Sequence, residues 1–226
     1  MIGIIGAMAQ EVAILKGLIK NQKIEQVMHV AFTVGTLNGR EVVLLESGIG
    51  KVNVAIATTL LLERFDVQCV INTGSAGGIK ADAEVGDVVI STTVSYHDVD
   101  VTGFGYDWGQ VPGLPADFVA DAGLVAKVAS VLDDIPHFKG QIVTGDVFVN
   151  RPEQMALIKG NFPDAVALEM EAAAVAQVCH IAEVPFVVVR ALSDIAGKES
   201  HVSFEEFLPR AAAASSEMVV KLVGLL

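Results

Sequence analysis

The chain has 226 residues, 52% of them hydrophobic, which is enough to bury the core of one large α/β domain over residues 1–226. It carries 27 acidic and 15 basic residues, a formal net charge of −12, and no run of Lys or Arg, so we expect no nucleic-acid partner. No apolar run approaches the ~20 residues of a membrane span, and the first residues lack the basic region of a signal peptide. We therefore expect a cytoplasmic protein with no membrane partner.

Short β-branched runs alternate with segments of helical periodicity, the pattern of a β-sheet covered by helices on both faces. In the first half we expect strands at 2–5, 30–37, 41–46, 69–72 and 87–95, and helices at 9–19 and 51–65. Asn38-Gly39 predicts a tight hairpin turn between the second and third strands. In the second half we expect an ordered loop at 104–115, helices at 118–132, 153–159, 171–179 and 204–226, and strands at 141–144, 165–168 and 186–192.

Carboxylates gather where the predicted strands end. Ligand sites of open α/β sheets form beyond the carboxyl ends of the strands, so these positions are the first candidates for chemistry. Four of the ends carry acids, namely Glu11, Asp146, Glu169 with Glu171, and Asp194. Asp194 is the most informative of them, because a strand as apolar as 186–192 rarely ends in an acid by accident.

Each of these features also has a plainer interpretation. Glu11, Glu169 and Glu171 stand where acids often begin helices on the protein surface. Met170 and Phe148 are core residues by their residue type. The segment 74–78, Gly-Ser-Ala-Gly-Gly, could cradle a phosphate or form a tight strand-to-helix turn, and it lacks the Lys-Ser/Thr of a nucleotide-binding loop.

The acids suggest a reaction that needs no metal. The five histidines show no ligand spacing, so we expect neither a metal nor a cofactor. Cys69 and Cys179 lie in apolar stretches and are predicted to be buried free thiols, which suits a reducing compartment. Converging carboxyl groups fit cleavage of a glycosidic bond, in which one protonates the leaving group and another activates water.

Six motifs, in order along nearly the whole chain, resemble those of the 5′-methylthioadenosine/S-adenosylhomocysteine nucleosidase family. They are Ile2-Gly-Ile-Ile-Gly-Ala-Met-Ala-Gln-Glu11, Ser47-Gly-Ile-Gly-Lys51, Asn72-Thr-Gly-Ser-Ala-Gly77, Tyr96-His-Asp-Val-Asp-Val-Thr-Gly-Phe-Gly-Tyr106, Glu169-Met-Glu171 and Val188-Val-Arg-Ala-Leu-Ser-Asp194. The resemblance implies a nucleoside-phosphorylase-like fold, with a central mixed β-sheet flanked by helices, in a homodimer.

The implied reaction is hydrolysis of the N-glycosidic bond of 5′-methylthioadenosine, S-adenosylhomocysteine and 5′-deoxyadenosine. It releases adenine and a 5-substituted ribose, in methionine salvage and activated-methyl-cycle recycling. The order of preference among the three substrates stays open, because it depends on loops and on the partner subunit.

The resemblance also implies roles for individual residues. Glu11 activates the water, Asp194 protonates adenine at N7, and Ser193 holds Asp194 in place. Glu171 binds the ribose hydroxyls, Met170 packs against the sugar, Phe148 stacks on adenine, and the Val149 backbone bonds to the base. Ser75 and Arg190 arrange the water and the acids, and Ala76, Gly77 and Glu169 belong to the binding site. The alkylthio group is surrounded by Ile49, Phe204, and Phe104 with Pro112 of the partner subunit.

Two departures and two rival functions accompany this resemblance. Ala9-Gln10 replaces a common Glu-Glu, which affects the surface more than the mechanism, and Gly103 replaces a common Ala. A phosphorolytic enzyme would cleave the same bond, but Asn72 stands where related phosphorylases have an Arg, and Glu11 would repel phosphate. A non-catalytic nucleoside sensor would need the pocket without the acid.

Overall fold

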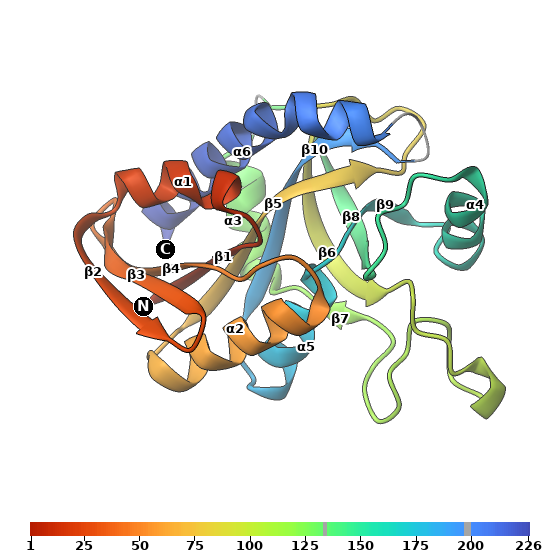
Figure 1. The fold of residues 1–226 in the computed structure, drawn as a ribbon, viewed down its shortest axis with the longest axis horizontal. Helices are drawn as coiled ribbons and strands as arrows, with labels where there is room; N and C mark the ends of the chain where they lie inside the picture. The colour runs from red at the N-terminus through yellow and green to blue at the C-terminus, as the bar shows by residue number, and fades with distance from the viewer. Residues whose placement is uncertain (133–134, 197–199) are drawn as a thin grey trace.

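The computed structural model describes residues 1–132, 135–196 and 200–226, and its centre is a mixed β-sheet (Figure 1). The strands are β1 Ile2–Gly6, β2 Lys20–Val27, β3 Val30–Leu37, β4 Arg40–Glu46, β5 Cys69–Gly78, β6 Val88–Tyr96, β7 Phe118–Val119, β8 His137–Thr144, β9 Ala165–Glu169 and β10 Phe186–Ile195. The helices are α1 Ala9–Leu18, α2 Lys51–Arg64, α3 Ala122–Ser130, α4 Pro152–Asn161, α5 Ala172–Ile181 and α6 Ser200–Leu225, with a short 3₁₀ turn η1 at Thr102–Phe104.

Part of the sheet closes on itself. Strand β10 pairs with both β5 and β6, β6 pairs with β8, β8 with β9, and β9 pairs back with the last residues of β5. The remaining strands extend from β5 through β1 and β4 to β3 and the edge strand β2. Because β5 belongs to both parts, its C-terminal half lies beside the ends of β9 and β10. Residues from three distant parts of the sequence therefore meet at one place.

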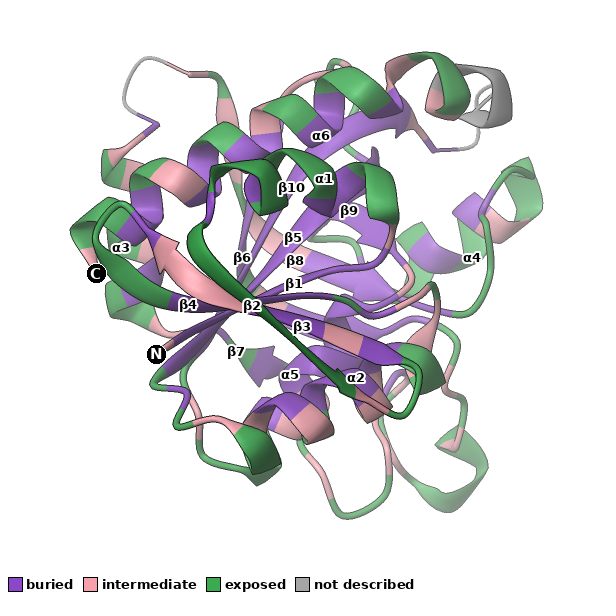
Figure 2. Ribbon diagram, turned by 60° about the vertical axis from the view of Figure 1, so that its left-hand side comes forward, coloured by how far each residue is buried: buried purple, intermediate pink, exposed green. Residues whose placement is uncertain are grey.

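Helices cover both faces of the sheet, as Figure 2 shows for the buried strands in purple. Helices α1, α3 and α6 pack on one face through a core that includes Leu15, Val128 and Leu222. Helices α2 and α5 pack on the other face, where Leu61 and Cys179 are fully buried. The α/β class with a mixed sheet flanked by helices is thus confirmed. In the described part of the chain, no helix has both the length and the apolar character needed to cross a bilayer.

The predicted hairpin is confirmed, and its turn explains why this pair of residues is used. Asn38 and Gly39 both have positive φ, 48° and 78°, between the antiparallel strands β3 and β4. Such a two-residue turn needs positive φ at both positions, which Asn and Gly tolerate better than other residues.

Three predictions about elements need correction. The helix predicted at 118–132 begins only at Ala122, because Phe118–Val119 pairs with β6 and Asp121 caps the helix by accepting a hydrogen bond from the Leu124 N–H. The glycine-rich segment is no turn, since β5 continues through it to Gly78. Strand β10 likewise continues past Leu192 to Ile195. Strand β2 was not predicted, because its residues are polar and exposed at the edge of the sheet.

Candidate active site

A cavity of about 300 Å³ opens where β5, β9 and β10 come together. Twelve of the predicted site residues line it: Ile49, Ser75, Ala76, Gly77, Phe148, Val149, Glu169, Met170, Glu171, Ser193, Asp194 and Phe204. Four lining residues were not predicted, namely Ala7, Met8, Val147 and Leu168. Ala7 and Met8 lie within the first motif, and Val147 and Leu168 stand next to the predicted residues Phe148 and Glu169, which was the only available signal for them.

Glu11 lies immediately behind the cavity wall, in the first turn of α1, and is only 1% exposed. One carboxylate oxygen accepts hydrogen bonds from the N–H groups of Ala7 and Met8, at 2.9 and 3.1 Å. The other accepts from the Ser75 N–H and hydroxyl, both at 2.9 Å. Four donors fix the orientation of this group, so the interpretation of Glu11 as a surface acid is wrong.

Gly74 makes this arrangement possible. Its φ of +149° lies in a region that favours glycine. A Cβ atom there would lie 2.6 Å from the Glu11 carboxylate and 2.5 Å from the Arg190 guanidinium. The Ser75 N–H, which a phosphate cradle would need, is already bonded to Glu11. The phosphate-cradle interpretation of this segment therefore does not fit the structure.

Arg190 is fully buried and binds the acids from beneath the cavity instead of lining it. Its Nη2 donates to Glu169 Oε2 and, at 2.9 Å, to Asn72 Oδ1, and lies 3.6 Å from Glu171 Oε2. Glu169 also accepts from the N–H groups of Glu171 and Ala172, both at 2.9 Å. A buried guanidinium needs such paired acceptors. Arg190 and Glu169 therefore form a fixed support beneath Glu171.

Asp194 faces the cavity from β10, which is irregular at this point. Leu192 pairs with Ala76 and Asp194 with Gly77, so Ser193 is an extra residue in the register. The Ser193 hydroxyl donates to Asp194 Oδ1 at 2.9 Å. Burial raises the pKa of the Asp194 carboxyl and outweighs the opposite effect of this hydrogen bond. Asp194 therefore holds a proton more readily than an exposed aspartate and is suited to donate it.

Glu171 carries the clearest electrostatic perturbation. Burial and the neighbouring Glu169 raise its pKa to about 8, against the lowering effects of Arg190 and of the Gly50 N–H, which donates to Glu171 Oε1 at 2.9 Å. Like charges brought together in a poorly hydrated site favour retention of a proton.

This shift predicts a pH-dependent stability. Because the pKa of Glu171 is about 8 in the folded protein and 4.5 ordinarily, its contribution to stability is complete below pH 4.5 and is lost as the pH rises toward 8. The variant Glu171→Gln cannot titrate there. We expect its thermal unfolding midpoint to fall less than that of the wild type between about pH 5 and 9. Equal slopes in a thermal-shift titration would contradict the raised pKa.

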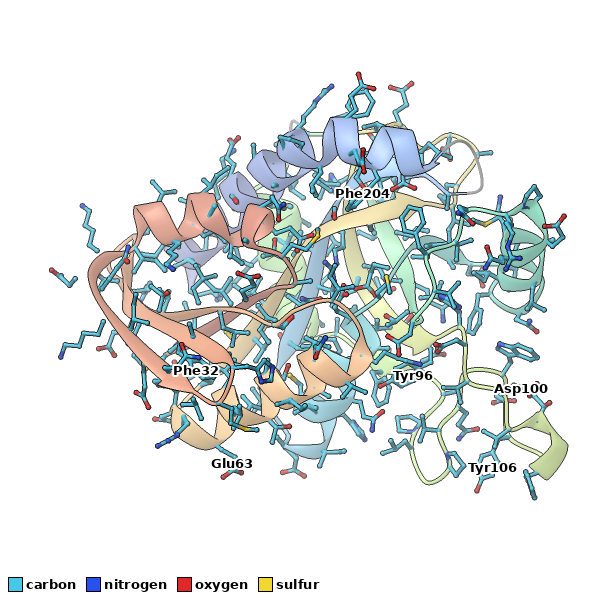
Figure 3. The ribbon with its side chains drawn as sticks, viewed as in Figure 1. Phe32, Glu63, Tyr96, Asp100, Tyr106 and Phe204 are labelled. Carbon is cyan, nitrogen blue, oxygen red and sulfur yellow. The ribbon has the colours of Figure 1, made fainter. Side chains whose placement is uncertain are left out.

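Two aromatic rings are among the residues that line the cavity. Phe148 follows β8, and Phe204 lies near the start of α6, where Figure 3 labels it above the strand ends. Their ring centroids are 6.0 Å apart, with the planes at 72°. Phe148 is 40% exposed, and such an exposed aromatic ring can stack on a planar heterocycle.

Phe104 and Pro112 lie away from the cavity of their own chain. Both belong to the loop between β6 and β7, which projects from the body with Asp100 and Tyr106 (Figure 3). Phe104 is 84% exposed, an unusual state for a large apolar side chain. A Cβ atom added at the nearby Gly103 would meet nothing within 4 Å, so an Ala would also fit there.

Two further predictions concern groups outside the site. Cys69 and Cys179 are buried free thiols, as predicted. Ala9 and Gln10, which depart from the common family pattern, are exposed on α1, so this departure does lie at the surface. Across the described ranges, no cluster of three or more His, Cys, Asp or Glu side chains could hold a metal ion.

The partly closed mixed sheet, with an acidic cavity at its strand ends, defines an α/β protein whose site is suited to acid–base chemistry. The family model described as "Phosphorylase superfamily" matches residues 1–224. The 5′-methylthioadenosine/S-adenosylhomocysteine nucleosidase of Bacillus subtilis is 56% identical over 225 residues, which cover 98% of this chain and 97% of that protein. The chain belongs to the 5′-methylthioadenosine/S-adenosylhomocysteine nucleosidase family of this superfamily, and the resemblance seen in the sequence is confirmed.

Solved structures agree with this assignment. The Neisseria meningitidis nucleosidase, in complex with methylthio-immucillin-A, superimposes with a TM-score of 0.97 at 47% identity, covering 100% of this chain and 99% of that one. The Colwellia psychrerythraea nucleosidase, in complex with adenine, gives a TM-score of 0.97 at 48% identity, covering 100% and 95%.

Proposed function

We propose that this protein hydrolyses the N-glycosidic bond of 5′-methylthioadenosine, S-adenosylhomocysteine and 5′-deoxyadenosine, releasing adenine and the 5-substituted ribose. The single observation that carries the proposal is that two carboxyl groups with different surroundings, Asp194 and Glu11, lie at one cavity. Burial raises the pKa of Asp194, whereas four hydrogen-bond donors fix Glu11 behind Ser75. Glycosidic cleavage needs one acid to protonate the leaving group and one base to activate water.

The steps follow from these positions. Asp194 donates its proton to N7 of adenine as the bond to the ribose breaks, and the sugar develops oxocarbenium character. Glu11 takes a proton from water, whose oxygen bonds to the anomeric carbon. Glu171 accepts hydrogen bonds from the ribose hydroxyls, and Arg190 with Glu169 holds it from below. The atoms of the reaction balance without a cofactor, because adenine gains a proton and ribose gains the hydroxyl group of the water.

The remaining lining residues bind the substrate on both sides of that bond. Phe148 stacks on adenine, and the backbone of Val149 bonds to the base. Met170 packs on the sugar, with Ser75, Ala76 and Gly77 of β5 beneath it. Ile49 and Phe204 enclose the 5′ substituent.

The site is better suited to water than to phosphate as the attacking molecule. Phosphate recognition requires cations with free donors. Arg190 lies beneath the cavity, where Asn72 and Glu169 accept from it, and Glu11 adds negative charge. We expect adenine release from 5′-methylthioadenosine at an undiminished rate in phosphate-free buffer, measured by chromatography. A rate that instead requires added phosphate, with a sugar phosphate as product, would overturn the hydrolytic assignment.

The same proposal includes a homodimer in which Phe104 and Pro112 of the partner subunit complete the wall around the 5′ substituent. The exposure of Phe104, and of Val52 at the start of α2, supports this arrangement, because both are large apolar side chains without cover in the monomer. Sedimentation velocity should give twice the chain mass of 23.7 kDa. A monomer that retains full activity would contradict this part of the proposal.

We place the enzyme in the cytoplasm, in methionine salvage and activated-methyl-cycle recycling, with residues 1–226 acting as one nucleosidase domain. The buried free thiols of Cys69 and Cys179 suit a reducing compartment. The closed set of strands joins β5 with β10 across the chain, which supports one folding unit.

A further inference from the structure

A compact group of charges lies behind the cavity wall and contributes no residue to its lining. Lys51, Asp98 and Asp146 come from the segments that follow β4, β6 and β8. Lys51 Nζ lies 2.6 Å from Asp98 Oδ2 and 3.7 Å from Asp146 Oδ2. The two acids are joined as well, because the Asp146 N–H donates to Asp98 Oδ2 at 2.9 Å. We call these three residues the charged cluster.

The cluster is attached to the proposed ribose site through the start of α2. The Gly50 N–H donates into the cavity, to Glu171 Oε1 at 2.9 Å. The next N–H along the chain, that of Lys51, donates away from the cavity, to Asp146 Oδ1 at 2.8 Å. Asp146 also places its negative charge at the positive end of the helix. The position of Asp146 therefore determines how the Gly50 N–H faces Glu171.

The same cluster is attached to the part of the cavity that is proposed to bind adenine. Asp146 stands two residues before Phe148, and Asp98 fixes its backbone through the 2.9 Å hydrogen bond. Beneath the cluster, the Tyr96 ring lies 5.4 Å from Lys51 Nζ, a cation–π distance. Figure 3 shows Tyr96 between the body and the projecting loop. Tyr96 is itself held on α5, because its hydroxyl donates to Gln177 at 2.8 Å.

The pair of Lys51 and Asp98 is less exposed than an ordinary surface ion pair. These two side chains are only 23% and 19% exposed, and the Asp146 side chain beside them is 46% exposed. The ion pair between Lys221 and Glu217 on α6 is 44% and 66% exposed, and neither residue lines the cavity. Partly buried, networked charges resist screening and hold geometry, whereas exposed pairs contribute little.

From these contacts we infer that Lys51, Asp98 and Asp146 are positioning residues for the reaction. They set the distance between two parts of the substrate site. The Gly50 N–H links the cluster to the Glu171 carboxylate on the ribose side, and the backbone of residues 146–148 links it to the Phe148 ring on the adenine side. Misalignment of sugar and base slows bond cleavage more than it weakens binding, since the apolar walls still hold the nucleoside. This inference rests on the proposed nucleosidase function.

The test compares Asp98→Asn and Lys51→Met with the control Lys221→Met, which removes a lysine of an exposed ion pair. We expect both cluster variants to lose about 10- to 100-fold in kcat, with KM changed less than about threefold. The control should match the wild type. The double variant should lose no more than the worse single variant, because the two side chains act through one contact.

Three outcomes would overturn the inference: cluster variants with the kcat of the control, a raised KM with unchanged kcat, or independent losses that multiply in the double variant. If Lys51→Met unfolds, Asp146→Ala serves as the replacement, because it removes the acceptor of the Lys51 N–H. Wild-type adenine release is measured in the same assay. An inactive wild type would overturn the proposed function, whereas an active wild type with equally active variants overturns only the positioning role.

Discussion

Replacing Asp194 by Asn is expected to lower kcat by about 10²- to 10⁴-fold while leaving nucleoside binding largely intact. The substitution keeps the size of the side chain and an oxygen that can accept from the Ser193 hydroxyl. It removes the proton that adenine needs as it leaves. Steady-state adenine release gives kcat, and calorimetry with an adenosine analogue gives the affinity.

Ser193→Ala is the matched control for this experiment. It removes the hydrogen bond that lowers the pKa of Asp194, together with a longer one of 3.4 Å to the Ala76 carbonyl, so we expect a smaller loss of kcat. An Asp194→Asn enzyme with nearly normal turnover would show that the proton comes from another group. A wild-type protein that binds the analogue and never releases adenine would be a nucleoside sensor, the rival that keeps the pocket without the chemistry.

The variant Glu11→Gln is expected to lose about 10²- to 10⁴-fold in kcat, because the amide cannot take a proton from water. It should also lower the thermal unfolding midpoint. Both oxygens of Glu11 accept hydrogen bonds from N–H or hydroxyl donors, so an amide nitrogen at either place would face donors and leave buried groups unpaired.

Gln10→Glu tests whether a change of one charge on α1 next to Glu11, here of the opposite sign, affects turnover by itself. It places a carboxylate on the exposed face of α1, one residue from Glu11. We expect wild-type kcat and a nearly unchanged midpoint, measured by single-turnover adenine release and thermal unfolding. If Glu11→Gln turned over as fast as Gln10→Glu, the water-activating role of Glu11 would be wrong.

Local sequence patterns were sufficient to predict several strands and many of the site residues of this protein. Alternation of residues and the positive-φ turn at Asn38-Gly39 predicted β3 and β4. The motifs named most of the lining residues of the cavity, because each motif is a contiguous segment that contains or follows the C-terminal end of a strand, whereas Phe148, Val149 and Phe204 lie outside the motifs. The acids at 11, 171 and 194 and the Arg at 190 were all visible in the sequence as residue types that need a partner.

The partners themselves were decided by the tertiary structure. Closure of β5 against both β9 and β10 brings Gly77 beside Leu168 and Asp194, and no periodicity encodes such long-range pairing. The extra residue at Ser193 shifts the register of β10, and strand propensity cannot place such an irregularity. Edge strand β2 forms because β3 offers it free hydrogen-bonding groups, not because its residues are apolar.

The sequence by itself thus determined the family, the layered α/β architecture and which residue types could do chemistry. Only the tertiary structure decided that Arg190 would bind the acids from below, that Glu11 would be buried, and that Lys51, Asp98 and Asp146 would meet behind the cavity. The physical reason is the range of the interactions. Periodicity and turn geometry act over a few neighbouring residues, whereas burial, charge pairing and pKa depend on groups that folding brings together from distant segments.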